Sequence, residues 1–242
     1  MYAEHKPQDG IARWVECTWT IEPAGPVRAF PVRPDGCMDL LYSRDAGLAI
    51  VGPMTREQRF DLAAGDQRTG LRFRPGMARS FLGIGAAELC DRVVPLSDVI
   101  GKAAHEVRSR LDAAASNRER REILLQAVKA AGLQDDAVHR AIAAMTRFHG
   151  EVNVDWAADQ AGMSARQFQR RCKEESGLAP KQLARILRFR RACRLAERGE
   201  SWLRVAAEAG YFDQAHLIRD FREFTGTTPV SDFSKTGEAA IG

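Results

Sequence analysis

Two short stretches of the chain carry arginine and glutamine at a spacing suited to contact with the edges of nucleic-acid bases. The candidates are Arg166, Gln169 and Arg170 in the first stretch, and Gln214, Ala215, His216 and Arg219 in the second. Positions three and four apart share one face of an α-helix. Arginine can donate two hydrogen bonds to guanine, and glutamine can pair with adenine. We therefore predict that these residues contact bases in the DNA major groove, although His216 fits a packing role equally well.

Four further basic residues lie close to these stretches, namely Lys173, Lys181, Arg188 and Arg222. Cationic side chains bind the phosphate backbone, which fixes affinity and register without reading the base sequence. We assign these four residues to phosphate contacts. For any single arginine in the region, the alternative is an ordinary solvated surface charge.

The first stretch needs a helix to present it, and the residues before it predict one. Ala158 precedes Gly162 by four positions, and Ser164 follows as a good helix N-cap. A small residue lets two helices cross closely, and glycine adopts the left-handed conformation of the turn. Phe168 then supplies an apolar anchor for the second helix. This is the pattern of a helix-turn-helix unit.

The second stretch repeats the pattern with a turn that is one residue longer. Ala206 precedes Gly210 by four positions, Asp213 can cap the next helix, and Leu217 and Phe221 are the apolar anchors. One such pattern is common in helical hairpins. Two copies, each with a cap and a basic second helix, favour a DNA-binding domain over a plain helical bundle.

A long helix is predicted between the two units. Pro180 suits the first turn of a helix, and the helical pattern runs from Lys181 to Glu197 before Gly199. Such a helix is about 25 Å long at 1.5 Å per residue. The major groove returns to the same face of B-DNA every ~34 Å, so a rigid connector of this length can hold two recognition helices in successive grooves.

Charge is distributed unevenly along the 242 residues. Residues 1–138 hold 19 Lys and Arg against 19 Asp and Glu, whereas the remaining residues hold 17 against 13, which accounts for the net charge of +4. The positive excess in the C-terminal part indicates a polyanionic partner. Hydrophobic residues at 45% and charged residues at 28% exclude a wholly disordered chain. No apolar window is long enough for a membrane helix, and no secretory signal is visible.

The chain changes from strand-like to helical patterns along its length. We expect an α+β protein in which residues 1–95 form an antiparallel, barrel-like or sandwich-like regulatory domain. Residues 96–135 fit a helical connector or a dimerisation surface, and residues 136–234 fit an all-α domain of two helix-turn-helix units joined by a long helix. We expect a flexible tail at 235–242.

The C-terminal part resembles the AraC/XylS family of bacterial transcription regulators over Asp136–Phe233. The most specific similarity lies in Ala206–Arg222 and the following Gly226–Pro229, while Gly177–Pro180 resembles the start of the family's connecting helix. Cys172 and Arg171 depart from the family pattern, which commonly has phenylalanine and an apolar residue there. The resemblance implies a bi-helical domain acting on promoter DNA. Carried over by position, it assigns base contacts to Arg166, Gln169, Arg170, Gln214, Ala215 and Arg219.

The N-terminal part resembles a domain type often joined to such regulators. The similar segments are Pro34–Leu40, Val51–Thr55, Arg72–Gly76 and Phe81–Gly83. The resemblance implies a regulatory or effector domain without implying a general ligand. A small-molecule effector would be lined by aromatic residues of the strands, for which the candidates are Trp14, Trp19, Phe30, Tyr42 and Phe73. Such residues are more often simple core residues.

Alternatives to an effector-controlled regulator remain open. A DNA-binding domain joined to a cysteine-based enzyme or redox sensor would use Cys37, which follows a turn but has no histidine partner nearby in the sequence. A third alternative is an N-terminal domain that only dimerises or binds another protein. We expect no enzyme, no cofactor and no metal site, because the histidines lack ligand spacing and the five cysteines form no paired motif.

The scattered cysteines also favour a reducing cytoplasm. The expected partner is double-stranded promoter DNA. RNA polymerase, a small-molecule effector and a second copy of the chain are the further partners that a regulator of this kind can have.

Overall fold

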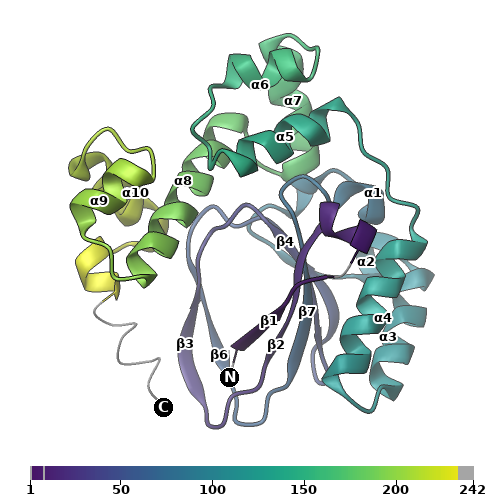
Figure 1. The fold of residues 1–242 in the computed structure, drawn as a ribbon. Helices are drawn as coiled ribbons and strands as arrows, with labels where there is room; N and C mark the ends of the chain where they lie inside the picture. The colour runs from purple at the N-terminus through teal and green to yellow at the C-terminus, as the bar shows by residue number, and fades with distance from the viewer. Residues whose placement is uncertain (1, 8, 234–242) are drawn as a thin grey trace.

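The computed structural model describes residues 2–7 and 9–233 and has a β-rich N-terminal half and a helical C-terminal half (Figure 1). The tail expected at 235–242 lies outside the described residues. Strands precede helices along the chain, as the sequence patterns predict. The fold is therefore α+β with a separate helical domain.

The main sheet has six antiparallel strands in the order β1-β2-β7-β4-β5-β8. In that order they span Tyr2–His5, Val15–Ile21, Arg68–Phe73, Met38–Ser43, Gly47–Val51 and Val93–Pro95. A separate ribbon pairs β3 (Val27–Val32) with β6 (Gln58–Leu62). Within the described residues the strands do not close, so the expected barrel-like or sandwich-like unit is an open sheet with a ribbon beside it.

Alternation along the central strands gives the sheet one apolar and one polar face. Leu40, Leu71 and Phe73 are fully buried on the first face. On the other face the Arg72 guanidinium pairs with Asp39 at 3.0 Å. Side chains in a strand point alternately to opposite faces, so the apolar face needs a cover.

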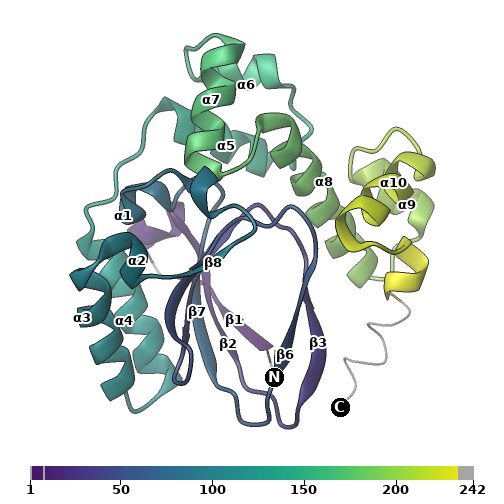
Figure 2. The ribbon, with the colours of Figure 1, turned by 180° about the vertical axis from the view of Figure 1, so that it is seen from behind.

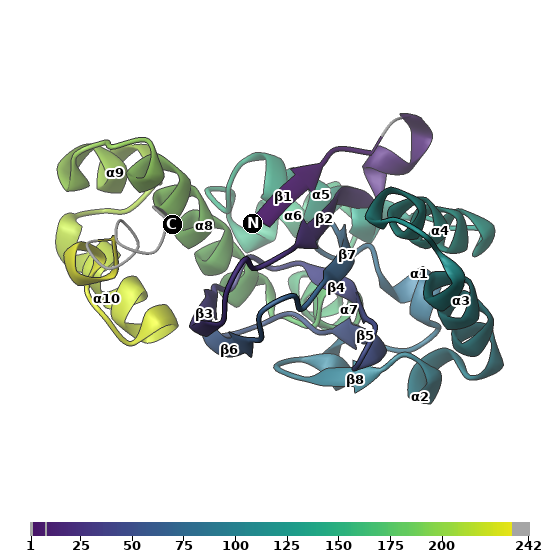
Figure 3. The ribbon, with the colours of Figure 1, turned by 90° about the horizontal axis from the view of Figure 1, so that it is seen from below.

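Two helices cover the apolar face. They are α3 (Lys102–Ala113) and α4 (Asn117–Ala130), which lie side by side against the sheet (Figure 3). Leu111, Leu124 and Val128 are fully buried in the same core cluster as the strand residues. The apolar stripe of α4 is therefore occupied within the chain. Short helices complete this half: η1 (Asp9–Arg13), α1 (Arg79–Leu82), η2 (Ala86–Leu89) and α2 (Ser97–Ile100).

Six helices build residues 137–225 of the C-terminal half, and a further helical segment begins at Pro229 within the described residues. The six helices are α5 (Ala137–Arg147), α6 (Val154–Gln160), α7 (Ala165–Ser176), α8 (Pro180–Glu197), α9 (Trp202–Glu208) and α10 (Gln214–Thr225). The helix α8 starts one residue before the predicted position and joins the two helix pairs (Figure 1). Its proline occupies the first turn, where an N–H has no helical partner.

The two halves pack directly on each other. The backbone N–H of Glu57, after β5, donates to the carbonyl of Phe224 in α10 at 2.6 Å. Arg33, after β3, pairs with Asp232 at 2.7 Å. Figure 2 shows α5, α6 and α7 above the upper ends of the strands, and α9 and α10 beside the ribbon of β3 and β6. Among the described residues, no helix combines the length and the apolar character that crossing a bilayer requires.

Two positions in the helical half require glycine for different reasons. Gly162, in the turn between α6 and α7, has a φ of +65° and open space where a Cβ would stand. Gly150, between α5 and α6, has a φ of +76°, and a Cβ there would lie 2.1 Å from the carbonyl oxygen of Ala184 in α8. The first glycine is required by conformation alone, and the second also by the close approach of α8.

We expect Gly150→Ala to destabilise the protein more than Gly162→Ala. The left-handed conformation costs alanine about 1–2 kcal/mol at either position. Displacing α8 adds about 1–3 kcal/mol at position 150, by analogy with overpacked cores. Urea unfolding followed by circular dichroism measures both values. Equal losses for the two variants would contradict the tight contact with α8.

Candidate nucleic-acid interface

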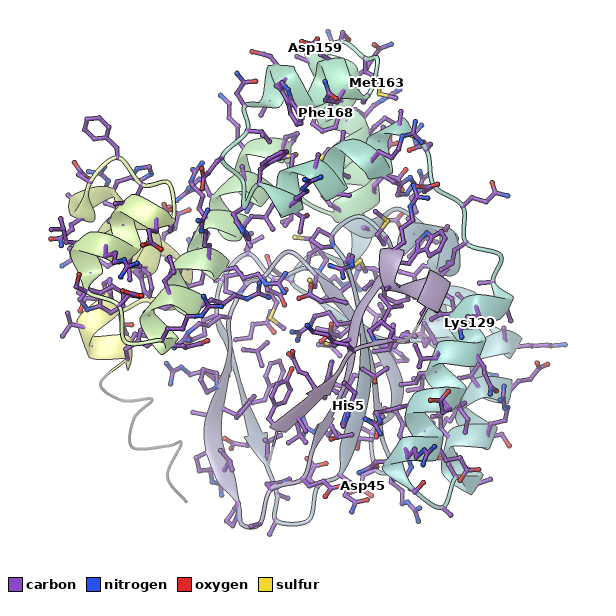
Figure 4. All side chains as sticks on the ribbon, viewed as in Figure 1. His5, Asp45, Lys129, Asp159, Met163 and Phe168 are labelled. Atoms are coloured by element: carbon purple, nitrogen blue, oxygen red, sulfur yellow. The ribbon has the colours of Figure 1, made fainter. Side chains whose placement is uncertain are left out.

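The first helix-turn-helix unit is built by α6, the turn at Gly162 and α7. Ser164 caps α7, since its Oγ accepts from the Gln167 N–H at 3.3 Å, and the Gln167 side chain accepts from the Ser164 N–H at 3.0 Å. Phe168 is fully buried below the turn. Figure 4 shows Asp159 and Met163 at the outer tip of the domain, away from the sheet. The predicted cap and anchor are confirmed.

The outward face of α7 carries residues predicted to contact bases together with a residue predicted to contact phosphate. Arg166, Gln169, Arg170 and Lys173 are exposed and line one shallow groove, which Lys181 of α8 closes at its end. The Arg170 side chain is 73% exposed and has only a long contact with Glu174, at 3.9 Å. A groove with four cationic side chains and a glutamine amide suits a duplex with its phosphates and base edges.

The second unit is built in the same way by α9, the turn at Gly210 and α10. Asp213 caps α10 by accepting from the His216 N–H at 2.6 Å. The anchors Leu217 and Phe221 are buried. Four predicted contact residues are exposed on α10, namely Gln214, Ala215, Arg219 and Arg222.

His216 differs from the other predicted base readers. Its ring stacks edge-on against Tyr211 at 5.0 Å, and the side chain is half-buried. Arg188, predicted to contact phosphate, is also half-buried and donates to the carbonyl of Gly150 at 3.1 Å. Both residues thus have packing roles, and their DNA contacts stay predictions.

Arg185 was missed by the sequence analysis and fixes α10 to α8. Its guanidinium donates to Asp220 at 2.7 Å and to Glu223 at 3.0 Å, and it lies 5.2 Å from the ring of Phe224. The hydrogen bonds that Arg185 donates to Glu223, followed by those it donates to Asp220, outweigh burial and raise the pKa of Arg185. Asp220 is 2% exposed, so Arg185 compensates a buried charge. No sequence spacing could have indicated this contact, because the partners are 35 and 38 positions apart.

A second missed residue, Glu175, ties α7 to the N-terminal half. Its carboxylate is 2% exposed and accepts from Arg79 of α1 at 2.6 Å and from Arg171 at 3.1 Å. His139 of α5 lies between two carboxylates, with Nε2 3.4 Å from Glu175 and Nδ1 2.8 Å from Asp136. The departure Arg171 from the family pattern therefore has a partner in this structure.

These contacts raise the pKa of His139 and lower the pKa of Glu175. Burial lowers the pKa of His139, but hydrogen bonds and charges of Glu175 and Asp136 outweigh it and raise the pKa above its ordinary 6.5. Burial raises the pKa of Glu175, but hydrogen bonds from His139 and Arg79 outweigh it and hold the pKa below its ordinary 4.5. The network thus favours a charged imidazolium beside a charged carboxylate.

The aromatic candidates for effector contact are spread over the N-terminal half. Phe73 and Tyr42 lie in the core under the helices, and Tyr42 donates to Asp112 at 2.7 Å. Trp14 packs at the edge of that core. Trp19 lies on the opposite face and donates to Asp39 at 3.1 Å, and Phe30 is on the ribbon. The structure does not bring the five together, and their effector contacts stay predictions.

Cys37 has the surroundings of an inert thiol. Its side chain is buried, and burial, with the nearby charge of Asp35, raises the pKa well above its usual value. The sulfur lies 3.6 Å from a carboxylate oxygen of Glu16 and 3.6 Å from Arg190. Because the thiolate is the reactive form, this environment does not favour nucleophilic chemistry.

Comparison with protein families gives one match in each half of the chain. Residues 157–234 match a model described as a helix-turn-helix domain, and residues 3–95 match a domain of unknown function, DUF6597. A search of curated proteins gives no match.

Three solved structures show similarity to this chain. The DNA-binding domain of AdpA, a global transcriptional factor solved with a target DNA, is 29% identical, with 45% of this chain and 100% of that one covered and a TM-score of 0.41. A transcriptional dual regulator from Escherichia coli K-12 is 26% identical, with coverages of 44% and 96% and a TM-score of 0.39. ToxT from Vibrio cholerae is 12% identical, with coverages of 96% and 97% and a TM-score of 0.42.

We expect the network around Glu175 to give stability a defined pH dependence. His139 binds its proton more tightly when folded, so its contribution is complete below about pH 6.5 and is lost as the pH rises through the raised pKa. Glu175 contributes above about pH 4.5, and its contribution is lost as the pH falls through the lowered pKa. Urea unfolding at pH 6 and pH 8.5 should show a loss of stability in the wild type that is smaller in His139→Gln.

The matched control is His105→Gln, which removes an exposed histidine of α3. This variant should keep the wild-type difference between pH 6 and pH 8.5. If His139→Gln also kept it, the imidazolium would not be part of the network.

Proposed function

The chain is an AraC-type helix-turn-helix transcription regulator with an N-terminal DUF6597 domain, and from this premise we propose that both of its units bind one face of the same DNA duplex. The observation that carries the proposal is the gathering of Arg166, Gln169, Arg170 and Lys173 in one groove on α7. The helix α10 presents a second set of exposed polar and basic residues. Both helices therefore have the composition of recognition helices.

Rigid attachment to α8 supports binding in successive grooves. The 18 residues of α8 span about 27 Å at 1.5 Å per residue. Arg185, in the first third of this helix, holds α10 against it, and Arg188 holds the chain before α6 by donating to the carbonyl of Gly150. Because neither unit is connected by a flexible linker, their separation is set by the protein rather than by the DNA. A groove repeat of ~34 Å lies within reach of recognition helices extending from the two ends.

We further propose that the N-terminal half controls DNA binding in response to an effector. This half contacts both recognition helices near their C-terminal ends, through Arg79 to Glu175 in α7 and through Glu57 to Phe224 in α10. A ligand that changes this packing changes the relative placement of the units. Linkage then requires that it also change DNA affinity.

Regulation at a promoter acts directly or indirectly on RNA polymerase, so we count the polymerase and a second copy of the chain among the proposed partners. A regulator of this kind works where the DNA is, which places it in the bacterial cytoplasm.

The base-reading role of Arg170 predicts a loss that depends on DNA sequence. Duplexes selected from a random library by the full-length protein provide the specific target, and scrambled duplexes provide the reference. Arg170→Ala should weaken binding to the selected duplex by about 1–3 kcal/mol. Lys173→Ala should weaken both duplexes alike and reduce the salt dependence by about one unit.

Fluorescence anisotropy over a range of salt concentrations measures both effects. Arg118→Ala, at an exposed position of α4, is the matched control and should bind like the wild type. An equal loss for Arg170→Ala on selected and scrambled duplexes would remove its base-reading role.

The rigid connector predicts a strict spacing between the two contacted sites in the DNA. Inserting about 5 base pairs turns the second site to the opposite face of the duplex, and inserting about 10 moves it one full turn away. We expect both insertions to abolish the contribution of α10, since α8 cannot lengthen. Footprinting should then show one protected groove instead of two. Recovery with the longer insertion would indicate a flexible connection.

A further inference from the structure

A cavity of about 410 Å³ lies between the two halves, apart from the groove on α7. Its walls come from η1 and β2 and the segment after β7 on one side, and from α5 and α8 on the other. These elements meet at the upper end of the sheet in Figure 1. The volume falls within the range of small-molecule sites.

The cavity gathers an unusual number of arginines. They are Arg13, Arg74, Arg147, Arg190, Arg191 and Arg194. Among the described residues that line the cavity, Glu16 is the only one with a carboxylate, and it pairs with Arg190 and with Arg194. Two more carboxylates, of Asp135 and Glu151, pair with arginines of the set. Six positive charges thus meet three negative ones.

The arginines keep donors available beyond these pairs. A guanidinium has five N–H groups, and the ion pairs of Arg191 with Glu151 and of Arg194 with Glu16 each use a single nitrogen. Arg147 is exposed and stacks over the ring of Phe148 at 5.6 Å. An anion entering the cavity therefore meets several donors that are already held in place.

The pKa of His149, in the wall of the cavity, is consistent with this excess of positive charge. Burial and the charges of Arg191 and Arg194 lower the pKa of His149 below its usual value. Protonation is unfavourable because it would add a further positive charge. A negatively charged ligand would reverse this effect.

The remaining wall is apolar. Pro75, Met77, Ala143 and Leu187 contribute to the lining. A purely hydrophilic ion such as inorganic phosphate would leave this surface without a partner. The lining suits a molecule with an oxyanion at one end and a compact apolar body at the other.

We propose that this interdomain cavity is a binding site for a small organic oxyanion with a compact apolar body. A carboxylate and a phosphate monoester share the required chemistry, since both accept paired hydrogen bonds from guanidinium groups. Arg13 and Arg74 belong to the N-terminal half, and Arg147 and Arg191 belong to the helical half. The bound molecule contacts both halves and stabilises their docked arrangement.

The site is distinct from the proposed DNA surface. None of the residues that line the cavity lines the groove on α7. The helix α5 lies in front of α7 in Figure 1, and α7 lies in front of α5 in Figure 2. The arginines of the cavity thus provide a second, separate anion-binding feature of the chain.

We assign the bound anion as the effector of the proposed regulator. This identification as an effector rests on the proposed function, whereas anion binding itself does not. Binding itself is measured on the full-length protein without DNA. A failure of DNA binding and a failure of anion binding are therefore distinguishable.

The test uses benzoate and phenyl phosphate as the two anionic probes, with benzyl alcohol as the uncharged analogue and inorganic phosphate as the ion without an apolar body. Isothermal titration calorimetry gives the affinities, and thermal unfolding gives an independent measure because a ligand of the folded state raises the melting temperature. We expect benzoate, phenyl phosphate or both to bind at least about tenfold more tightly than either control. A preference between the two anions identifies the head group.

Arg147→Gln and Arg194→Gln each remove one charge from the cavity without removing the Glu16–Arg190 pair. Each should weaken binding of the anionic probe about tenfold, the usual scale for a hydrogen bond to a charged group. Arg118→Gln makes the same change of net charge on α4 and should bind the probe like the wild type.

Three results would overturn the proposal. They are the absence of heat and of a thermal shift with both anionic probes, equal binding of benzyl alcohol, and unchanged affinity in both cavity variants. A loss of DNA affinity in both cavity variants when no anion is present would instead assign these arginines to the DNA surface, and would overturn it as well.

Discussion

A buried carboxylate at the junction of the two halves constrains the rest of this structure. Removing the Glu175 charge from water is costly, and the cost is offset only if cations and hydrogen-bond donors surround it. Arg79 arrives from the N-terminal half, and Arg171 and His139 arrive from the helical half. Contacts with these three partners keep the Glu175 side of α7 packed in the interior. The outer face, with Arg166 and Gln169, is exposed to solvent, which the proposed contact with DNA requires.

The same principle fixes the second recognition helix. Asp220 is almost fully buried on the inner face of α10, and Arg185 of α8 compensates its charge. In both units a charged contact on the inner side therefore accompanies polar and basic residues on the outer side. A regulator with two such helices needs this division, because each helix must be held by the protein while it offers hydrogen-bonding groups to a partner.

The interface between the halves has two different chemistries. Around Glu175 the charges are nearly matched and the side chains are buried. Around Arg190 the positive charges exceed the negative ones, and a cavity separates the walls. The matched part holds the halves together in the absence of a ligand, while the unmatched part remains open to an anion. The contact of this interface with α7 and α10 supports the proposed control of DNA binding.

The sequence by itself determined the local structure of the DNA-binding half. Caps such as Ser164 and Asp213, anchors such as Phe168 and Phe221, and the proline at the start of α8 act over a few positions, so their spacing was sufficient. It also indicated that the N-terminal half is built of antiparallel strands. Only the tertiary structure decided that the sheet stays open, that the stripe of α4 covers it, and that Glu175 and Arg185 are central. Apart from Arg171, their partners lie tens to about a hundred positions away, and the burial that gives these charges their importance exists only after the chain has folded.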